Sequence, residues 1–151
     1  MLRQFLAGSA ISLCNITIHA MVMTLVVQIA QRVSEITSTR PALRLVAVMI
    51  GAVSVLMAAH VIEVIVWSTA YSILDAVPSG NSLVYFAFVN YTTLGYGDIT
   101  PLKEWELLGP MTAMNGVLLF GWSTAVIFEV LRKAMTLNSR LQSFNNHCRS
   151  R

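Results

Sequence analysis

Charged side chains are scarce in this chain. They make up 11% of its 151 residues, against 56% hydrophobic residues, whereas a soluble domain usually carries about 25% charged residues. The scarcity arises from long uncharged stretches, which indicate an integral membrane protein rather than a soluble globular one. One domain is expected, because too little chain remains outside these stretches for a soluble regulatory domain of ordinary size.

The residue patterns of disulfide-bonded, voltage-sensing and catalytic proteins are also missing. Cys14 lies in an apolar run and Cys148 near the C-terminal end, and two such distant cysteines predict neither a disulfide framework nor a metal site. No apolar stretch carries arginine at every third position, as a voltage sensor does. Because no nucleophile–base set or metal triad is evident, we do not expect an enzyme.

Three apolar segments are long enough to cross a bilayer, and they run roughly over Ala10–Ala30, Ala42–Tyr71 and Pro110–Leu131. A helix rises about 1.5 Å per residue and the hydrocarbon core is about 30 Å thick, so about 20 residues suffice. The first segment could instead be a secretory signal. It is long for that role, carries Asn15 and His19, and is followed by no small-x-small cleavage site, so we interpret it as a retained helix.

The positions of the basic residues predict the orientation. Arg32, Arg40 and Arg44 surround the first connection, and a second basic group follows the third segment. That group consists of Arg132, Lys133, Arg140, Arg149 and Arg151. The positive-inside rule places both regions in the cytoplasm, so three spans require the N-terminus to be outside. We therefore expect a multi-pass protein of the plasma (inner) membrane that contacts lipids, and its net charge of +3 needs no nucleic-acid partner.

The connection between the second and third segments is then external. Its charged residues are Asp75, Asp98, Lys103, Glu104 and Glu106. The acidic excess agrees with an external position and would raise the local concentration of cations. Trp67, Tyr71 and Trp105 fit an aromatic belt at the outer membrane surface.

The same connection contains a glycine-rich run, Thr92-Thr93-Leu94-Gly95-Tyr96-Gly97-Asp98. Before it, the turn cluster at residues 78–81 and the N-cap Ser82 predict a short helix that ends at about Thr92. This helix is apolar but too short to span, so we interpret it as re-entrant; a β-strand would leave its backbone groups unsatisfied in lipid. Glycines allow successive carbonyl groups to point the same way, and such oxygens can replace the hydration shell of an alkali cation.

In this setting the run resembles the selectivity filter and pore helix of the potassium channel superfamily. Leu94 stands where that family most often has valine, and Tyr96 and Asp98 match its potassium-selective form. Pro101 and Trp105 fall where bacterial two-span channels carry a proline and a tryptophan. In the third segment, residues 116–125, GVLLFGWSTA, resemble the inner-helix pattern G-x-x-x-F-G-x-x-T-A. The likeness covers roughly residues 42–133, with about one residue deleted in the outer connection.

The resemblance implies an all-α membrane protein with three transmembrane helices, a re-entrant pore helix and a filter loop, assembled as a homotetramer. Residues 1–40 would be an extra transmembrane helix with a cytoplasmic linker, residues 41–134 the pore domain, and residues 135–151 a short basic cytoplasmic tail. Permeant K⁺ ions, the expected ligands in place of any organic cofactor, would be bound by Thr93, Leu94, Gly95, Tyr96 and Gly97. The cavity or inner gate would be formed by Gly116, Val117, Phe120, Thr124 and Phe128. Gly116 is either a gating hinge or a site of close helix packing.

Other residues are expected to support the filter from behind. They are Asp98, Tyr85, Thr92, Glu63 and His60. Tyr85 occupies the position where related channels often place an indole donor to the aspartate, so we predict a Tyr85–Asp98 hydrogen bond rather than a solvated Asp98 at the pore mouth.

His60 and Glu63 lie three residues apart and share one face of the second span. Ionisable groups at that depth usually face the protein interior with a partner. We favour a structural polar cluster with Asn90, Tyr91 or Thr92, and a proton sensor is the alternative. Two ligands alone do not predict a zinc site, and we interpret Asn15 and His19 as helix-packing residues.

The sequence therefore predicts a potassium-selective channel that conducts passively. A weakly selective cation channel and a non-conducting membrane subunit that uses the pore fold for assembly are the alternatives. Leu137, Leu141 and Phe144 form an apolar stripe in the tail. The tail would either continue the inner helix into a small bundle or lie on the anionic inner leaflet.

Overall fold

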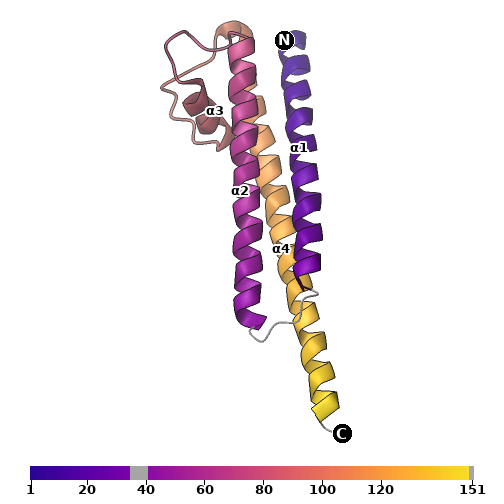
Figure 1. The fold of residues 1–151 in the computed structure, drawn as a ribbon. Coiled ribbons are helices and arrows are strands. Elements are labelled where there is room, and N and C mark those ends of the chain that lie inside the picture. The colour runs from indigo at the N-terminus through magenta and orange to yellow at the C-terminus, as the bar shows by residue number, and fades with distance from the viewer. Residues whose placement is uncertain (35–40, 150–151) are drawn as a thin grey trace. The chain divides into compact units, whose positions relative to one another are not determined.

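The computed structural model describes residues 1–34 and 41–149, and within them the chain is helical without strands. Its elements are α1 (Leu2–Ser34), α2 (Pro41–Ile73), α3 (Leu83–Tyr91), a 3-10 turn (Lys103–Trp105) and α4 (Leu108–Arg149), shown in Figure 1. Arg40 of the predicted first connection and Arg151 of the tail lie outside the described residues.

Within the described residues, three helical stretches are long and apolar enough to cross a membrane, which confirms the predicted class of all-α membrane protein. They are Leu2–Val33, Ala42–Ile73 and Lys103–Lys133. The first helix begins at Leu2 rather than near Ala10. Its polar N-terminal residues have partners, because Gln4 Oε1 accepts from the Leu107 amide at 3.0 Å and the Arg3 guanidinium lies 4.6 Å from the Trp105 ring centre.

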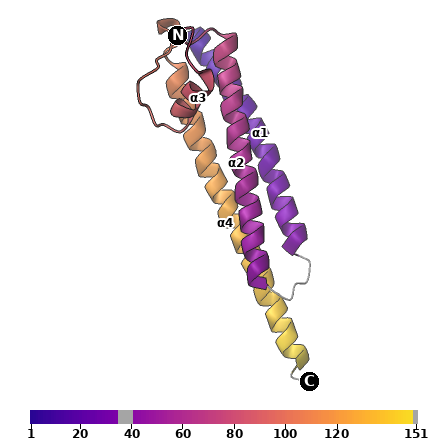
Figure 2. The same cartoon turned by 60° about the vertical axis from the view of Figure 1, so that its left-hand side comes forward.

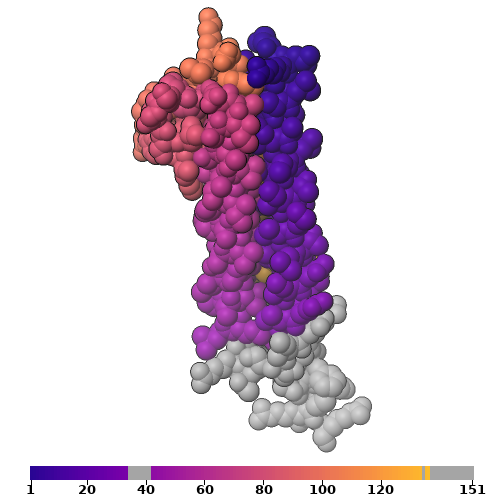
Figure 3. Space-filling view, turned by 45° about the horizontal axis from the view of Figure 1, so that its top comes forward, coloured from indigo at the N-terminus to yellow at the C-terminus, as the bar shows by residue number. Residues whose placement is uncertain are grey.

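The chain divides into two compact units, and each is described by itself. The first unit comprises residues 1–20 and 58–122. In it the N-terminal part of α1, the C-terminal part of α2, α3 and the start of α4 share one core. The segment between α2 and α4 forms a lobe on its surface, which Figure 3 shows beside α2 and the N-terminal end of α1.

Aromatic side chains fill the core of this first unit. Trp67 and Tyr71 are fully buried and Trp105 is 2% exposed, together with Phe86 and Tyr91 of α3. The predicted aromatic belt is therefore wrong for Trp67, Tyr71 and Trp105. These side chains are covered by α1, α3 and α4, and Trp67 and Tyr71 satisfy their polar atoms with Asn115 and Thr112 rather than at a membrane surface.

The second unit comprises residues 21–57 and 123–151. Val26, Ala52 and Val130 form its small buried core. An apolar groove of about 340 Å³ runs between α1 and α2, with Arg44 among its lining residues. α4 continues to Arg149, so the backbone of the tail prolongs the inner helix. The side chains of Leu137, Leu141 and Phe144 lie outside the described residues, and the choice between bundle and membrane surface stays open.

Candidate functional site

The helix before the glycine-rich run begins as the sequence predicts. Ser82 has an extended backbone, and its hydroxyl oxygen accepts a hydrogen bond from the Tyr85 amide, which satisfies one of the free donors at a helix start. α3 is nine residues long and ends at Tyr91. The glycine-rich run therefore begins directly at the C-terminal end of a short helix, seen beside α2 and α4 in Figure 2.

The backbone of the run alternates in hand. Thr93, Gly95 and Gly97 have positive φ angles of 61°, 60° and 75°, whereas Leu94 and Tyr96 between them do not. In an ordinary strand successive carbonyl groups point to opposite sides, but alternation of left- and right-handed residues turns successive peptide groups the same way. This backbone can therefore present a row of carbonyl oxygens along one side.

The amide groups in the first half of the run, from Thr92 to Gly95, are directed back to α3. The Val89 carbonyl accepts from the Leu94 amide at 2.9 Å and from the Gly95 amide at 3.4 Å, and the Thr93 amide bonds the Asn90 carbonyl at 2.9 Å. An N–H and the preceding C=O point in opposite directions across a peptide group. The Thr93 and Leu94 carbonyls, which precede the bonded Leu94 and Gly95 amides, therefore face away from α3 and are left for a ligand.

Large side chains around the run are uncovered within one chain. Leu94 is 55% exposed and Tyr96 67% exposed, and Val84 and Phe88 of α3 are also exposed. In a membrane protein, exposed apolar side chains of this kind face either lipid or another protein chain.

The predicted hydrogen bond between Tyr85 and Asp98 is present. The Tyr85 hydroxyl donates to Asp98 Oδ2 at 2.8 Å, and Asp98 Oδ1 accepts from the Ile99 amide at 3.1 Å. The hydrogen bond to the carboxylate raises the pKa of the Tyr85 phenol, because it stabilises the protonated form that donates. The pair connects the first turn of α3 to the last residue of the run.

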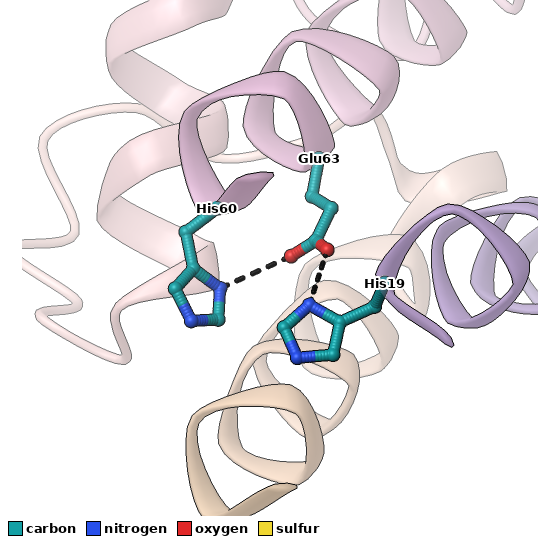
Figure 4. A group of neighbouring side chains, drawn as sticks. All are labelled: His19, His60 and Glu63. Atoms are coloured by element: carbon teal, nitrogen blue, oxygen red, sulfur yellow. Dashed lines mark hydrogen bonds and ion pairs between the residues drawn. The ribbon is translucent and has the colours of Figure 1, made fainter. Parts of the chain in front are cut away.

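A buried polar cluster lies at the other end of α3. The Glu63 carboxylate is placed between two imidazoles, with His19 Nδ1 2.7 Å from Oε1 and His60 Nδ1 3.1 Å from Oε2, as Figure 4 shows. The Tyr91 hydroxyl donates to Oε2 and lies 2.9 Å from His60 Nδ1. His19 and Glu63 are fully buried and His60 is 7% exposed. We call His19, His60, Glu63 and Tyr91 the His–Glu–Tyr cluster.

A second layer of hydrogen bonds fixes α1 beside this cluster. Asn15 Nδ2 donates to the Glu63 carbonyl at 3.2 Å and to Asn115 Oδ1 at 3.1 Å, and the Trp67 indole donates to the same Asn115 oxygen at 3.0 Å. Asn15 lies one turn before His19 on α1, so both residues face α2. These contacts join α1, α2 and α4 within the first unit.

The residues of the predicted cavity or gate all lie on α4, some in the first unit and some in the second. Gly116 is buried, and a methyl group in its place would overlap the Tyr91 carbonyl, which supports close packing of α4 on the end of α3. The Phe120 ring lies 4.6 Å from the His60 ring and 5.4 Å from the Tyr91 ring between centres. Val117 is 57% exposed in the first unit. Thr124 and Phe128 lie further along α4, in the second unit.

Sequence reasoning brought His60, Glu63 and Tyr91 together but missed His19. The signal was present, since a His and an Asn one turn apart on an apolar helix require polar partners in a neighbouring helix. The same reasoning gave no means of choosing α2 as that neighbour.

Comparison with known protein families supports a channel. Residues 59–133 match the family model described as ion channel. The match extends from just before His60 through the glycine-rich run to the basic residues Arg132 and Lys133 of α4, and it leaves His19 outside. It supports an ion channel of this family rather than an enzyme, and the three apolar helices support a multi-pass position in a membrane. No curated protein and no solved structure gave a match to the chain.

Proposed function

We propose that the chain forms a potassium-selective pore that conducts K⁺ passively through a filter made by residues 93–97. The observation that carries this proposal is the alternating backbone of the run, with φ positive at Thr93, Gly95 and Gly97. Carbonyl oxygens in a row are neutral, hard ligands, and they can replace the water around a potassium ion without binding it too tightly to leave.

Thr93 supplies a further ligand at the inner end of this row. Its hydroxyl donates to the Thr92 carbonyl at 2.6 Å, so the lone pairs of its oxygen remain available to a cation. The C-terminal end of α3 lies close by, and its partial negative charge favours a cation in the cavity below. Val117, Phe120, Thr124 and Phe128 would line that cavity or the inner gate, with Gly116 beside them.

One loop supplies only one side of a filter, and four copies around an axis would complete it. The exposure of Leu94 and Tyr96, at 55% and 67%, supports this assembly, because neighbouring copies would cover them. In the orientation proposed from the basic residues, the N-terminus and the filter mouth are external and the end of α4 is cytoplasmic.

The proposal is tested by ion flux into liposomes that contain the purified protein. We expect uptake of K⁺ and little uptake of Na⁺. Gly95→Ala should abolish K⁺ uptake, because a Cβ is unfavourable at φ 60°. Gly80→Ala is the matched control, since Gly80 has φ 89° in open space but lies outside the run; it should conduct normally.

Each alternative gives a different result. Equal uptake of K⁺ and Na⁺ would indicate a weakly selective cation channel. Absence of flux from a correctly assembled oligomer would indicate a non-conducting subunit that uses the pore fold for assembly. Either result would overturn potassium-selective conduction.

A further inference from the structure

Three metal-ligating side chains from two helices converge in the His–Glu–Tyr cluster. His19 comes from α1, and His60 and Glu63 come from α2. Each offers one ligand atom, and these atoms all lie within 4.8 Å of one another. All three residues are buried, so they form an enclosed site rather than a group of surface charges.

We propose that His19, His60 and Glu63 form a binding site for a divalent transition-metal ion of the zinc class. Two imidazole nitrogens and one carboxylate oxygen are the donor set that such ions prefer over Ca²⁺ or Mg²⁺. Two ligands of a tetrahedral zinc ion lie about 3.3 Å apart, given bonds of about 2.0–2.1 Å. The separations of 2.7 Å from His19 Nδ1 to Oε1 and 3.1 Å from His60 Nδ1 to Oε2 differ from this value by up to about 0.6 Å. The widest separation among the three ligand atoms, at most 4.8 Å, would close by up to about 1.5 Å when an ion binds.

A metal ion can replace the hydrogen on each Nδ1 without any loss of protons from the two imidazoles. Without metal, a hydrogen on each Nδ1 can be directed at the ionised Glu63 carboxylate. With metal, each Nδ1 gives its lone pair to the ion, and a neutral imidazole keeps its proton by carrying it on Nε2. A water would occupy the fourth position, beside the Tyr91 hydroxyl, which bonds Glu63 Oε2.

Two features of the surroundings favour such a site. Glu63 is also held through its backbone, since the Asn15 side chain of α1 donates to the Glu63 carbonyl. Support of this kind keeps metal ligands in position. Aromatic rings also cover the site, with Phe120 4.6 Å from His60 and Trp122 5.8 Å from His19 between ring centres. A site enclosed in this way excludes bulk water, which strengthens the attraction between the cation and the carboxylate.

Metal binding would act on the filter through Tyr91. An ion on Glu63 competes with the Tyr91 hydroxyl for the same carboxylate, and Tyr91 is the residue directly before the glycine-rich run. This consequence, unlike the site itself, rests on the proposed potassium channel function. We expect Zn²⁺ to change K⁺ flux of the wild-type protein and to leave that of His19→Gln unchanged.

The site is tested by titrating the full-length protein in detergent with Co²⁺, which substitutes for zinc and absorbs visible light in a tetrahedral nitrogen–oxygen site. We expect saturation at one Co²⁺ per chain and displacement of the colour by Zn²⁺. His19→Gln, His60→Gln and Glu63→Gln should each weaken binding by at least about tenfold. His147→Gln is the matched control, because it removes the remaining histidine of the three in the chain and should bind as the wild type does.

Several results would overturn the site. They are no saturable absorption in the wild-type protein, equal binding in the three ligand variants, or loss of binding in His147→Gln. The wild-type titration decides the question even if a ligand variant fails to fold. Quenching of Trp122 fluorescence by Co²⁺ gives an independent measure, since Trp122 lies beside His19.

The two proposals fail separately. Cobalt binding without K⁺ flux would retain the site and remove the channel function. If the protein binds Co²⁺ and its K⁺ flux is unchanged by Zn²⁺, the metal site and the channel function are both supported, but the effect of the metal on the filter is contradicted.

Discussion

A β-branched residue, Thr93, holds a backbone conformation that usually belongs to glycine. Its φ of 61° costs about 1–2 kcal/mol for a residue with a Cβ, and such strain persists only where the surroundings fix it. Here two neighbouring amides are held, because the Thr93 amide donates to the Asn90 carbonyl and the Leu94 amide donates to the Val89 carbonyl. The hydrogen bonds of the loop to α3 therefore hold Thr93 in this conformation.

Tyr85→Phe removes one hydrogen-bond donor and leaves the ring in place. We expect this variant to lose stability of the conducting loop, because Asp98 Oδ2 no longer has its phenol partner. The measurement is the decline of K⁺ current during sustained opening, which should be faster than in the wild type. Phe88→Leu, also on the exposed side of α3, is the control, and equal decline in Tyr85→Phe and wild type would contradict the supporting role.

The same bond has a defined pH dependence. Because the pKa of Tyr85 is raised, the stability that it contributes is present below the ordinary tyrosine pKa of about 10 and is lost as the pH rises through the raised pKa. Ultraviolet titration of tyrosinate, taken as wild type minus Tyr85→Phe, measures this transition. Asp98→Asn should move it to lower pH; a transition in the same place would show that Asp98 is not the cause.

At the scale of helices, α4 approaches α3 at a glycine. Gly116→Ala would place a methyl group on the Tyr91 carbonyl, and overpacking of this kind typically costs about 1–3 kcal/mol. We expect a lower thermal unfolding temperature and an altered K⁺ to Na⁺ flux ratio. Gly121→Ala is the control because its site is open, and a helix interior gains up to about 1 kcal/mol from the exchange.

A different outcome would identify Gly116 as a hinge. If Gly116→Ala keeps the wild-type unfolding temperature and flux ratio but changes open probability in single-channel recording, then flexibility of α4 rather than close packing explains the glycine. Unchanged open probability in Gly116→Ala would contradict a hinge at Gly116.

α1 is joined to the pore segment by side chains that the sequence presents as isolated polar residues. Asn15→Ala removes two interhelical hydrogen bonds, which in membranes average about 0.6 kcal/mol each and reach about 1.7. We expect a loss of about 1–2 kcal/mol, measured by thermal or denaturant unfolding in detergent. Thr17→Ala should be close to neutral, because that hydroxyl is exposed and bonds its own helix at Leu13.

The helices could be predicted from the sequence because their signal is local. Apolar length gave three spans, and the turn cluster with Ser82 gave the start of α3. The pairing of helices is not local, since it depends on which faces meet. For that reason the contact of His19 with Glu63 was missed, and Trp67 was expected at the membrane surface although it packs inside. The Tyr85–Asp98 contact was available only because the resemblance placed both residues.

At the scale of the whole molecule, the proposed tetramer would cover the exposed side chains of Leu94 and Tyr96 with neighbouring copies. We expect the purified protein in mild detergent to have a protein mass of about 66 kDa, four times the 16.6 kDa of one chain, by light scattering or native mass spectrometry. Tyr96 should become protected from iodination in the assembly, with Tyr85 as the internal comparison. A monomer or dimer that still conducts would contradict a filter built from four loops.

The long-range contacts of α1 can form only after later parts of the chain have been synthesised. His19 meets a carboxylate 44 residues later in the chain, and Asn15 meets an amide 100 residues later. At roughly 5–20 residues per second, a nascent chain carries these polar groups for about 2–9 s and 5–20 s before their partners exist. α1 therefore leaves the ribosome before the partners of its polar side chains, and until α2 supplies Glu63 for His19 and α4 supplies Asn115 for Asn15, water, lipid headgroups or the insertion machinery must cover these groups.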